Sequence, residues 1–513
     1  MSLFSQSGIT SVAADATVAV LIALLSVASF VCLVVFLCRF ADDTAPVKRK
    51  NVALLAIFGA GAVVRLTFAF CIRGYRADYA LFTDMFDNLK TSGLGGYYSG
   101  DASEVLYPTA YFVYLIFGGL ANVTGLGDFA LGTQFAVKLP LIIADLAAAY
   151  AVYLLASRYF NRRVALTLCA FVCACPVFFM GSAIWCTPIV FTACFICFAC
   201  YFVARKSYAP AIAFATAAAF SSKEGIYIFP ILLVFCAFHL VRALTDIRRR
   251  AKDKAQGRQS AEDNTAVRTA IVIPLAFVCA LVAAYALGLF MIFDYSYNPF
   301  TYIYEFTLAP LVGWKYFTYN GLSVYAIFNQ NGGAPAARFP SWVFVGVFAV
   351  IITAVVCVVY FTKRNRATLV MLAAYALFTM QVYYPGTTAI GMQSTLVVVL
   401  AAYALVKDKR LLSVLFVTGL AYVVNASATL ANAGYLGNLA DYYFTGADYT
   451  GSTLLSGGLG AITVTCAVVT LLAHLYFTII AVSVGMTGQK RMLRGANGFK
   501  ASLGEYFSRG KVD

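Results

Sequence analysis

Histidine is almost missing from this chain of 513 residues, which has only His239 and His474. Both lie in apolar segments, so a histidine-based metal site or catalytic triad is nearly excluded. Charged residues are scarce as well, at 12% of the chain against about 25% in soluble domains. Because 62% of the residues are hydrophobic, the sequence predicts an all-α polytopic membrane protein.

Other familiar signatures are missing too. The chain has no Walker, Gly-x-Gly-x-x-Gly or His-Glu-x-x-His pattern, and no internal repeat stands out. Its fourteen cysteines are scattered through apolar runs, as small buried hydrophobic residues are, and they predict neither a disulfide framework nor a metal site. The formal net charge of +15 does not indicate nucleic acid as a partner, because the basic residues follow the pattern of a membrane protein.

About thirteen apolar runs approach the roughly 20-residue length that crosses a membrane. They lie at about 17–40, 51–72, 136–156, 164–184, 187–204, 208–222, 226–243, 269–293, 341–361, 367–384, 392–406, 411–431 and 457–484. With the N-terminus outside, all but eight of the 37 Lys and Arg residues fall on one side, which predicts a cytoplasmic C-terminus. The eight exceptions are Arg65, Arg73, Arg76, Lys90, Lys138, Lys223, Lys315 and Arg338.

One apolar segment, "YPTAYFVYLIFGGL" at residues 107–120, decides this topology. Counting it as a span would invert every later loop, so we expect it outside, as a helix along the membrane interface. The membrane spans then lie in 17–72, which holds two of them, in 136–243 and in 269–484. The external parts are the N-terminus at 1–16 and two loops at 73–135 and 294–340. The cytoplasmic parts are a polar, basic linker at 244–268 and a basic tail at 485–513.

The first external loop begins with a charged stretch, "RGYRADYALFTDMFDNLKTSGLGGYY", residues 73–98. Ionisable residues at a membrane boundary are costly unless they are paired or functional. On a helix Asp84 and Asp87 would be neighbours, whereas Asp78 would be offset around the axis. The spacing leaves two interpretations open: a solvated surface helix, or a site built on Asp78 with Asp84 as a second acidic residue.

The same stretch resembles the first external loop of the GT-C glycosyltransferases, and the chain looks like a bacterial, dolichyl-phosphate-mannose-protein mannosyltransferase-like member. Many bacterial members read Gly-Tyr-x-x-Asp-x-x-x-Phe-x-x-Trp-x-x-x-Leu-x-x-x-Gly, followed by Tyr. Met85 stands where Trp is usual, and the spacing is otherwise kept by Gly74, Tyr75, Asp78, Phe82, Leu89, Gly93 and Tyr97-Tyr98. Further family positions are matched in "LYPTAYFVY" and "VKLPLIIADLAAAY" by Tyr107, Pro108, Lys138, Pro140 and Asp145.

The second half of the chain departs from the family pattern. A Trp-Gly-Gln-x-Asp segment is replaced by "IWCTPI", which keeps only Trp185. A Lys-Pro-Gln segment appears as "SSKEGIYIFP", with Lys223 kept and Glu224-Gly225 in place of Pro-Gln. A late His-Glu-Arg-Tyr motif has no counterpart in "VYYPGTTAIGMQ". The divergence implies an altered donor or acceptor specificity, or an inactive relative.

The resemblance implies a GT-C-like helix bundle in the plasma membrane. On the outer face, such an enzyme transfers a sugar from a polyprenyl-phosphate donor to an envelope glycan, lipid or protein acceptor. The configuration at the anomeric carbon of the sugar inverts. Asp78 matches the general base, which takes the proton of the acceptor hydroxyl. The leaving group is a lipid phosphate, so the site also needs positive charge. No cofactor is implied, the metal requirement stays open, and the partners expected are the lipid-linked sugar, its acceptor and membrane lipids.

Four of the basic residues outside the positive-inside pattern are candidates for contacting the substrate: Arg76 and Lys223 first, then Arg65 and Lys138. Each has a structural alternative. Arg65 could pair with Asp145, Lys138 could anchor a helix start, Lys223 with Glu224 could charge a short turn, and Arg76 could neutralise acidic neighbours. Tyr107 and Glu224 complete the predicted substrate-binding set.

Two other classes of protein compete with this interpretation. A secondary transporter or flippase for a lipid-linked sugar would place charges near the membrane midplane and show paired repeats. Here Asp145 is the deepest charge and stands nearly alone, while the other charges gather at one face, which favours surface chemistry. The second alternative, a catalytically inactive GT-C homologue, rests on the divergent second half.

Overall fold

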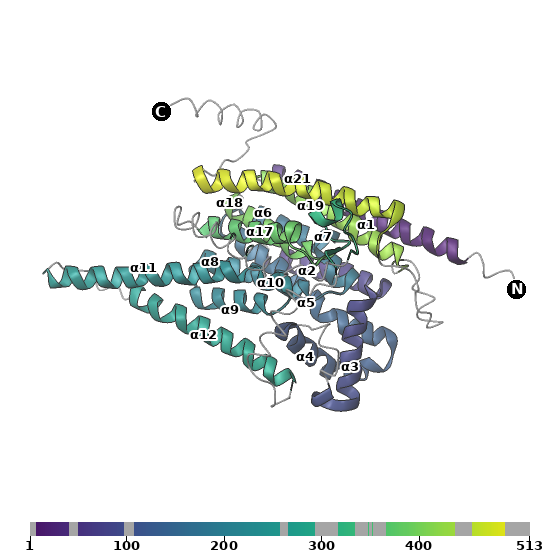
Figure 1. Cartoon of the computed structure of the whole chain (residues 1–513), viewed down its shortest axis with the longest axis horizontal. Helices are drawn as coiled ribbons and strands as arrows, with labels where there is room; N and C mark the ends of the chain where they lie inside the picture. Colours follow the sequence, from purple (N-terminus) through teal and green to yellow (C-terminus); the bar gives the residue numbers. More distant parts are fainter. Residues whose placement is uncertain are drawn as a thin grey trace, which may run out of the picture.

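The computed structural model describes residues 7–40, 50–96, 107–256, 265–292, 316–333, 366–434 and 454–487, together with Val347, Ile351 and Leu436. Nearly all of these residues are helical, and the long helices pack side by side into one bundle (Figure 1). The prediction of an all-α polytopic membrane protein is confirmed. Of the basic tail expected at 485–513, residues 488–513 lie outside the described residues.

Helices make up most of the described elements in both halves of the chain. The first half contains α1 (Ser7–Phe40), α2 (Lys50–Cys71), α3 (Arg76–Gly96), α4 (Pro108–Thr124), η2 (Leu126–Asp128), α5 (Ala130–Ala156), α6 (Arg162–Ala174), α7 (Pro176–Phe179), η3 (Met180–Trp185), α8 (Ile189–Arg205), α9 (Tyr208–Ala219) and α10 (Lys223–Ile226). The second half contains α11 (Phe229–Ala255), α12 (Thr265–Ile292), β1 (Thr318–Tyr319), α15 (Val324–Ile327), α17 (Arg366–Tyr383), β2 (Thr387–Thr388), α18 (Met392–Val406), α19 (Arg410–Asn432) and α21 (Gly457–Thr487).

Seven helices of the described part are long and apolar enough to cross a membrane, or eight if one bent pair counts as a span. Four shorter apolar helices join them: α8, α9, most of α17, and α18. The run expected at 341–361 lies outside the described residues apart from Val347 and Ile351. Helix α4, from the segment expected at the interface, is not among the spans. The division into external and cytoplasmic parts stays a prediction.

Helix α11 runs further than the sequence suggested, because it continues to Ala255 through part of the polar linker expected at 244–268. The extension reads "RRRAKDKA", and its arginines, lysines and alanines are strong helix formers.

The centre of the bundle is α18, which is buried at every one of its positions. A helix that is apolar all round is expected in such a place. Helices α5 and α8 pack on it, and α1, α2 and α12 lie outside with many apolar side chains exposed. Helices α3 and α4 lie at one side of the bundle, where α4 packs on α5 and α12 and α3 runs across the direction of α11 and α21 (Figure 1).

One span is broken. Helix α6 ends at Ala174, and α7 with η3 continues from Pro176 to Trp185 after a bend of 57°. Proline lacks an N–H group and its ring clashes with the preceding turn, so a break at this residue is the expected result. The chain then makes a π-helical turn over Met180–Trp185 and leaves it through Cys186, whose φ is +72°.

The break leaves backbone carbonyls of α6 without their usual partners, and a buried arginine satisfies them. The Val172 carbonyl would accept from residue 176, which is proline and has no N–H group. The Arg65 guanidinium donates to the carbonyls of Val172 and Cys173 at 3.0 and 2.6 Å, and to the Asp145 carboxylate at 2.8 Å. Ser182 of η3 donates to the same carboxylate at 2.7 Å. Arg65 thus holds both sides of the bend.

A second buried cation joins the end of α2 to the π-helical turn. Lys138 of α5 is fully buried, and its ammonium donates to the carbonyls of Ile72 and Ala183, the latter at 2.8 Å. Gln134, one turn earlier on α5, donates to the Ile72 carbonyl at 3.0 Å. These bonds fix the point where α2 ends relative to η3.

We expect Arg65→Met to lower the free energy of unfolding by about 3–5 kcal/mol, because it leaves a buried carboxylate without its counter-ion and two carbonyls without donors. The measurement is the thermal unfolding midpoint of the purified protein in detergent. Arg205→Gln is the control, since Arg205 lies at an exposed helix end over the Tyr201 ring. Equal midpoints for the two variants would contradict this role of Arg65.

Candidate active site

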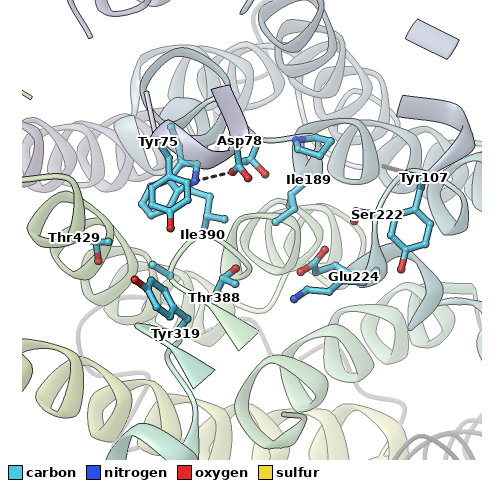
Figure 2. Close-up of a pocket in the computed structure, with 15 residues that line it drawn as sticks. Tyr75, Asp78, Tyr107, Ile189, Ser222, Glu224, Tyr319, Thr388, Ile390 and Thr429 are labelled. Atoms are coloured by element: carbon cyan, nitrogen blue, oxygen red, sulfur yellow. Dashed lines mark hydrogen bonds between the residues drawn. The ribbon is translucent and has the colours of Figure 1, made fainter. Parts of the chain in front are cut away.

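A cavity of about 220 Å³ opens where the ends of several helices meet. Its walls come from the start of α3, the residue before α4, the turn between η3 and α8, the start of α10, the turn after α17 and the end of α19. Figure 2 shows the lining residues, which are Tyr75, Asp78, Tyr107, Trp185, Thr187, Pro188, Ile189, Ser222, Lys223, Glu224, Tyr319, Thr388, Ala389, Ile390 and Thr429. Four of the eight predicted site residues are therefore brought together: Asp78, Tyr107, Lys223 and Glu224.

Asp78 lies at one edge of the cavity, half-buried in the first turn of α3. The indole Nε1 of Trp185 donates to its Oδ2 at 3.0 Å, drawn as the dashed line in Figure 2. The Tyr75 ring stacks on Trp185 with 4.7 Å between ring centroids. This hydrogen bond fixes the orientation of the carboxylate at the edge of the cavity, and an ionised carboxylate can accept a proton from a substrate.

Gly74 lets the start of α3 dock against the turn after η3. The Tyr75 N–H donates to the Trp185 carbonyl at 2.8 Å, and a Cβ at Gly74 would lie 2.8 Å from the same oxygen. The φ of Gly74 is +112°, a conformation that other residues rarely adopt. The Gly-Tyr-x-x-Asp spacing and Trp185, read separately in the sequence, form one contact in the structure.

Lys223 and Glu224 begin α10 on another wall. The Lys223 ammonium donates to the Gly386 carbonyl at 2.5 Å, which ties α10 to the turn after α17. Glu224 is buried, and in the described part of the chain neither a hydrogen bond nor an ion pair engages its carboxylate. The wall therefore offers a cation that retains donors and an acceptor available to a ligand.

Tyr107 adds a hydroxyl to the same cavity. Its side chain is buried, and its Oη has no hydrogen-bond partner among the described residues. Burial, followed by the negative charge of Glu224, raises the pKa of Tyr107 well above its usual value, so the hydroxyl stays protonated at neutral pH. Buried polar groups without partners carry a cost that a hydroxyl-rich ligand would remove.

Other lining residues had no signal in the sequence analysis. Strand β1 pairs in parallel with β2, with Thr318 opposite Thr387 and Tyr319 opposite Thr388, and this pairing completes the wall. Two-residue strands carry no periodic pattern that a sequence could show. The only hint was the Pro-Gly turn signal in "VYYPGTTAIGMQ", the segment that lacks the late family motif.

The other predicted residues lie elsewhere. Arg65 and Lys138 are buried on backbone carbonyls and do not line the cavity, and the alternative pairing of Arg65 with Asp145 is confirmed. Asp84 is exposed on α3 and is not part of the lining, whereas the side chain of Arg76 lies outside the described part. Among the described residues, no group of three or more His, Cys, Asp or Glu side chains could hold a metal ion.

We expect Gly74→Ala to destabilise the protein by about 1–3 kcal/mol, because alanine would be strained at this φ and would collide with the Trp185 carbonyl. Thermal unfolding in detergent measures the effect. Gly119→Ala is the control, since Gly119 lies inside α4 with nothing within 4 Å of an added Cβ. If Gly74→Ala and Gly119→Ala unfold at the same temperature, a glycine at position 74 is not needed for the start of α3 to pack against the turn after η3.

The comparisons with known proteins gave one match. Residues 127–250 match the family model described as dolichyl-phosphate-mannose-protein mannosyltransferase. The matched region runs from η2 to α11, and it contains Trp185, Lys223 and Glu224. No curated protein and no solved structure matches the chain significantly. The match covers about a quarter of the chain, and together with the all-α polytopic fold it supports a membrane glycosyltransferase of the GT-C type, similar to the dolichyl-phosphate-mannose-protein mannosyltransferases.

Proposed function

We propose that this protein transfers a sugar from a polyprenyl-phosphate donor to the hydroxyl of an envelope glycan, lipid or protein acceptor. The observation that carries the proposal is the meeting of Asp78, Lys223, Glu224 and Tyr107, from separate segments, in one cavity of a GT-C-type protein. A carboxylate, a cation and two hydroxyl-binding groups are the set that such a transfer needs.

The reaction follows from the placement of Asp78. The acceptor oxygen attacks the anomeric carbon of the donor sugar, and Asp78 takes the proton from that oxygen. The bond between the anomeric carbon and the phosphate oxygen breaks, and polyprenyl phosphate leaves from the opposite face, so the configuration inverts. Trp185 supports this step by fixing the carboxylate.

Positive charge stabilises the leaving phosphate, and Lys223 is our candidate within the cavity. One of its N–H groups is used by the Gly386 carbonyl, which positions the ammonium at the wall. Arg76, two residues before Asp78, is the second candidate by sequence. Tyr107 as a donor and Glu224 as an acceptor would bind sugar hydroxyls. Arg65 and Lys138 act indirectly, by holding the broken span that carries Trp185.

The direction of the spans supports a cavity on the outer face of the plasma membrane. Helix α2 begins at Lys50 and ends just before the cavity, and α6 begins at Arg162 and leads through η3 to Trp185. In both spans the cavity is therefore opposite the basic end, which the positive-inside rule assigns to the cytoplasm. This orientation also gives an external N-terminus and a cytoplasmic C-terminus.

Asp78→Asn is expected to lower kcat about 100-fold or more, because the amide cannot accept the proton although it can still accept the Trp185 hydrogen bond. The measurement is loss of label from radiolabelled polyprenyl-phosphate sugars in proteoliposomes, across a panel of donors. Asp84→Asn, on the exposed face of the same helix, should leave turnover unchanged.

Three outcomes would overturn parts of the proposal. Turnover that is unaffected by Asp78→Asn would keep the enzyme and remove Asp78 as the base. Tight donor binding without turnover of any donor would support an inactive homologue, and movement of the intact donor across the bilayer would support a flippase.

Trp185→Phe should lower kcat about ten-fold and leave the KM for the donor nearly unchanged. The phenyl ring still stacks on Tyr75, but the hydrogen bond to the Asp78 carboxylate is lost. Steady-state kinetics in proteoliposomes separates the two constants, and the unfolding midpoint shows whether the fold is intact. A rise in KM with unchanged kcat would mean that Trp185 binds substrate without orienting the base.

A further inference from the structure

The carboxylate of Glu224 is the one charged group of the cavity lining that has no partner among the described residues. Glu224 is 2% exposed, and Figure 2 shows its carboxylate directed into the space that the labelled residues surround. The other two charged groups are engaged, Asp78 by Trp185 and Lys223 by the Gly386 carbonyl. Carboxylates are almost never fully buried unless they are paired. Glu224 therefore calls for a partner that a ligand brings.

The groups next to Glu224 do not provide that partner. The Tyr107 and Tyr227 hydroxyls lie close enough to sense its charge, and neither carries a positive charge of its own. The Ser222 hydroxyl is engaged with the Thr192 hydroxyl at 2.8 Å. In the described part of the chain, the neighbours of the carboxylate are thus neutral hydroxyls and aromatic rings. Aromatic rings attract a cation as well.

The sequence beside the cavity adds little positive charge. Segment 97–106 precedes Tyr107, and segment 435–453 follows α19, the helix whose end lines the cavity. Together the two segments contain four acidic residues and no Lys or Arg. Segment 293–315, before β1, contains Lys315 as its only basic residue. The cation that would pair with Glu224 is therefore expected from the substrate.

The charges of the described lining also favour a cationic ligand. They are two carboxylates, Asp78 and Glu224, against one ammonium, Lys223. The proposed donor adds the negative charge of its phosphate, and like charges repel strongly where water is scarce. A sugar hydroxyl would donate to Glu224 and leave its charge uncompensated, whereas a protonated amine supplies a charge and three donors. The Tyr107 oxygen, without a partner among the described residues, offers that amine a second acceptor.

The position of Glu224 in the chain indicates which substrate carries the amine. Glu224 directly follows Lys223 at the start of α10, and consecutive Cα atoms lie about 3.8 Å apart. In the proposed function Lys223 stands at the leaving phosphate. Glu224 is then within reach of the sugar that this phosphate carries, so the amine belongs to the donor.

We propose that the donor is a polyprenyl-phosphate amino sugar and that Glu224 and Tyr107 bind its protonated amine. This inference rests on the proposed function, which places the phosphate of the donor at Lys223. Glu224 then determines which donor binds, while Asp78 remains the base of the transfer. Replacing Glu224 should therefore change the choice of donor without abolishing the transfer of a neutral sugar.

The test measures the affinity of the purified full-length protein for short-chain polyprenyl-phosphate donors, in detergent with EDTA. Each donor is made in three forms that differ at one ring position, with a hydroxyl, an amine or an N-acetyl group, and each ring position is tried in turn. The wild type should bind one amino donor about ten-fold more tightly than its hydroxyl and N-acetyl forms. Glu224→Gln keeps the size of the side chain and should bind the amino and hydroxyl forms equally.

Asp87→Asn is the matched control, because it also turns a carboxylate into an amide, on the exposed side of α3. It should keep the preference for the amino donor. Unfolding midpoints near that of the wild type show that the variants are folded. Should Glu224→Gln not fold, the preference of the wild type among the three forms still decides the proposal.

Loss of label from the same donors in proteoliposomes separates this inference from the proposed function. Turnover of a hydroxyl donor without any preference for an amine would overturn the inference and keep the transferase. A preference for an amino donor that depends on Glu224 but is followed by no turnover would keep the amine site and overturn the transfer.

Three further results would overturn the inference. A preference for the amine that survives Glu224→Gln would place the amine elsewhere in the protein. Tight binding of a hydroxyl donor that requires both Mg²⁺ and Glu224 would make the missing cation a metal ion. Turnover of a neutral donor that is stimulated by an amine-bearing acceptor, and not by its N-acetyl form, would move the amine from the donor to the acceptor.

Discussion

The bend at Pro176 is the constraint on which the rest of the structure depends. A membrane offers no water to backbone carbonyls, so the groups released by a broken span must find donors inside the protein. Arg65 supplies them for Val172 and Cys173. Its charge in turn requires Asp145 within the bundle, and Ser182 gives that carboxylate a further donor. The buried ion pair is therefore a consequence of the break.

The break also explains how the active site can exist where it does. A straight helix would carry the chain after Ala174 onward along the direction of α6. The bend and the π-helical turn instead aim Trp185 toward the start of α3, where its indole meets Asp78. Lys138 fixes the end of α2 to the same turn, so the loop that carries Asp78 and the turn that carries Trp185 share one anchor.

Much of this could be predicted from the sequence, for identifiable reasons. The spans follow from long apolar runs, and Asp78, Tyr107, Lys223 and Glu224 stand at the ends of such runs beside loops. The same rule, a cation outside the positive-inside pattern, also selected Arg65 and Lys138, which satisfy carbonyls instead of lining the cavity. Sequence cannot separate these cases, because the difference lies in which helices surround each side chain. The wall made by β1 and β2 depends on two segments far apart in the chain.

The polar side chains on one side of the cavity have hydrogen-bond partners within the protein, whereas, among the described residues, those on the other side do not. Asp78 has Trp185, and Lys223 has the Gly386 carbonyl, so these two groups are held in place before any substrate arrives. In the described part of the chain, the Tyr107 hydroxyl and the Glu224 carboxylate have no such hydrogen bonds. Fixed groups suit the bond-making step, where geometry sets the rate, whereas unsatisfied groups suit recognition, because an analogue that lacks the matching hydroxyl leaves them unpaired. Under the proposed function, this arrangement would give the chemistry to the Asp78 side of the cavity and sugar selection to the wall formed by Tyr107 and Glu224.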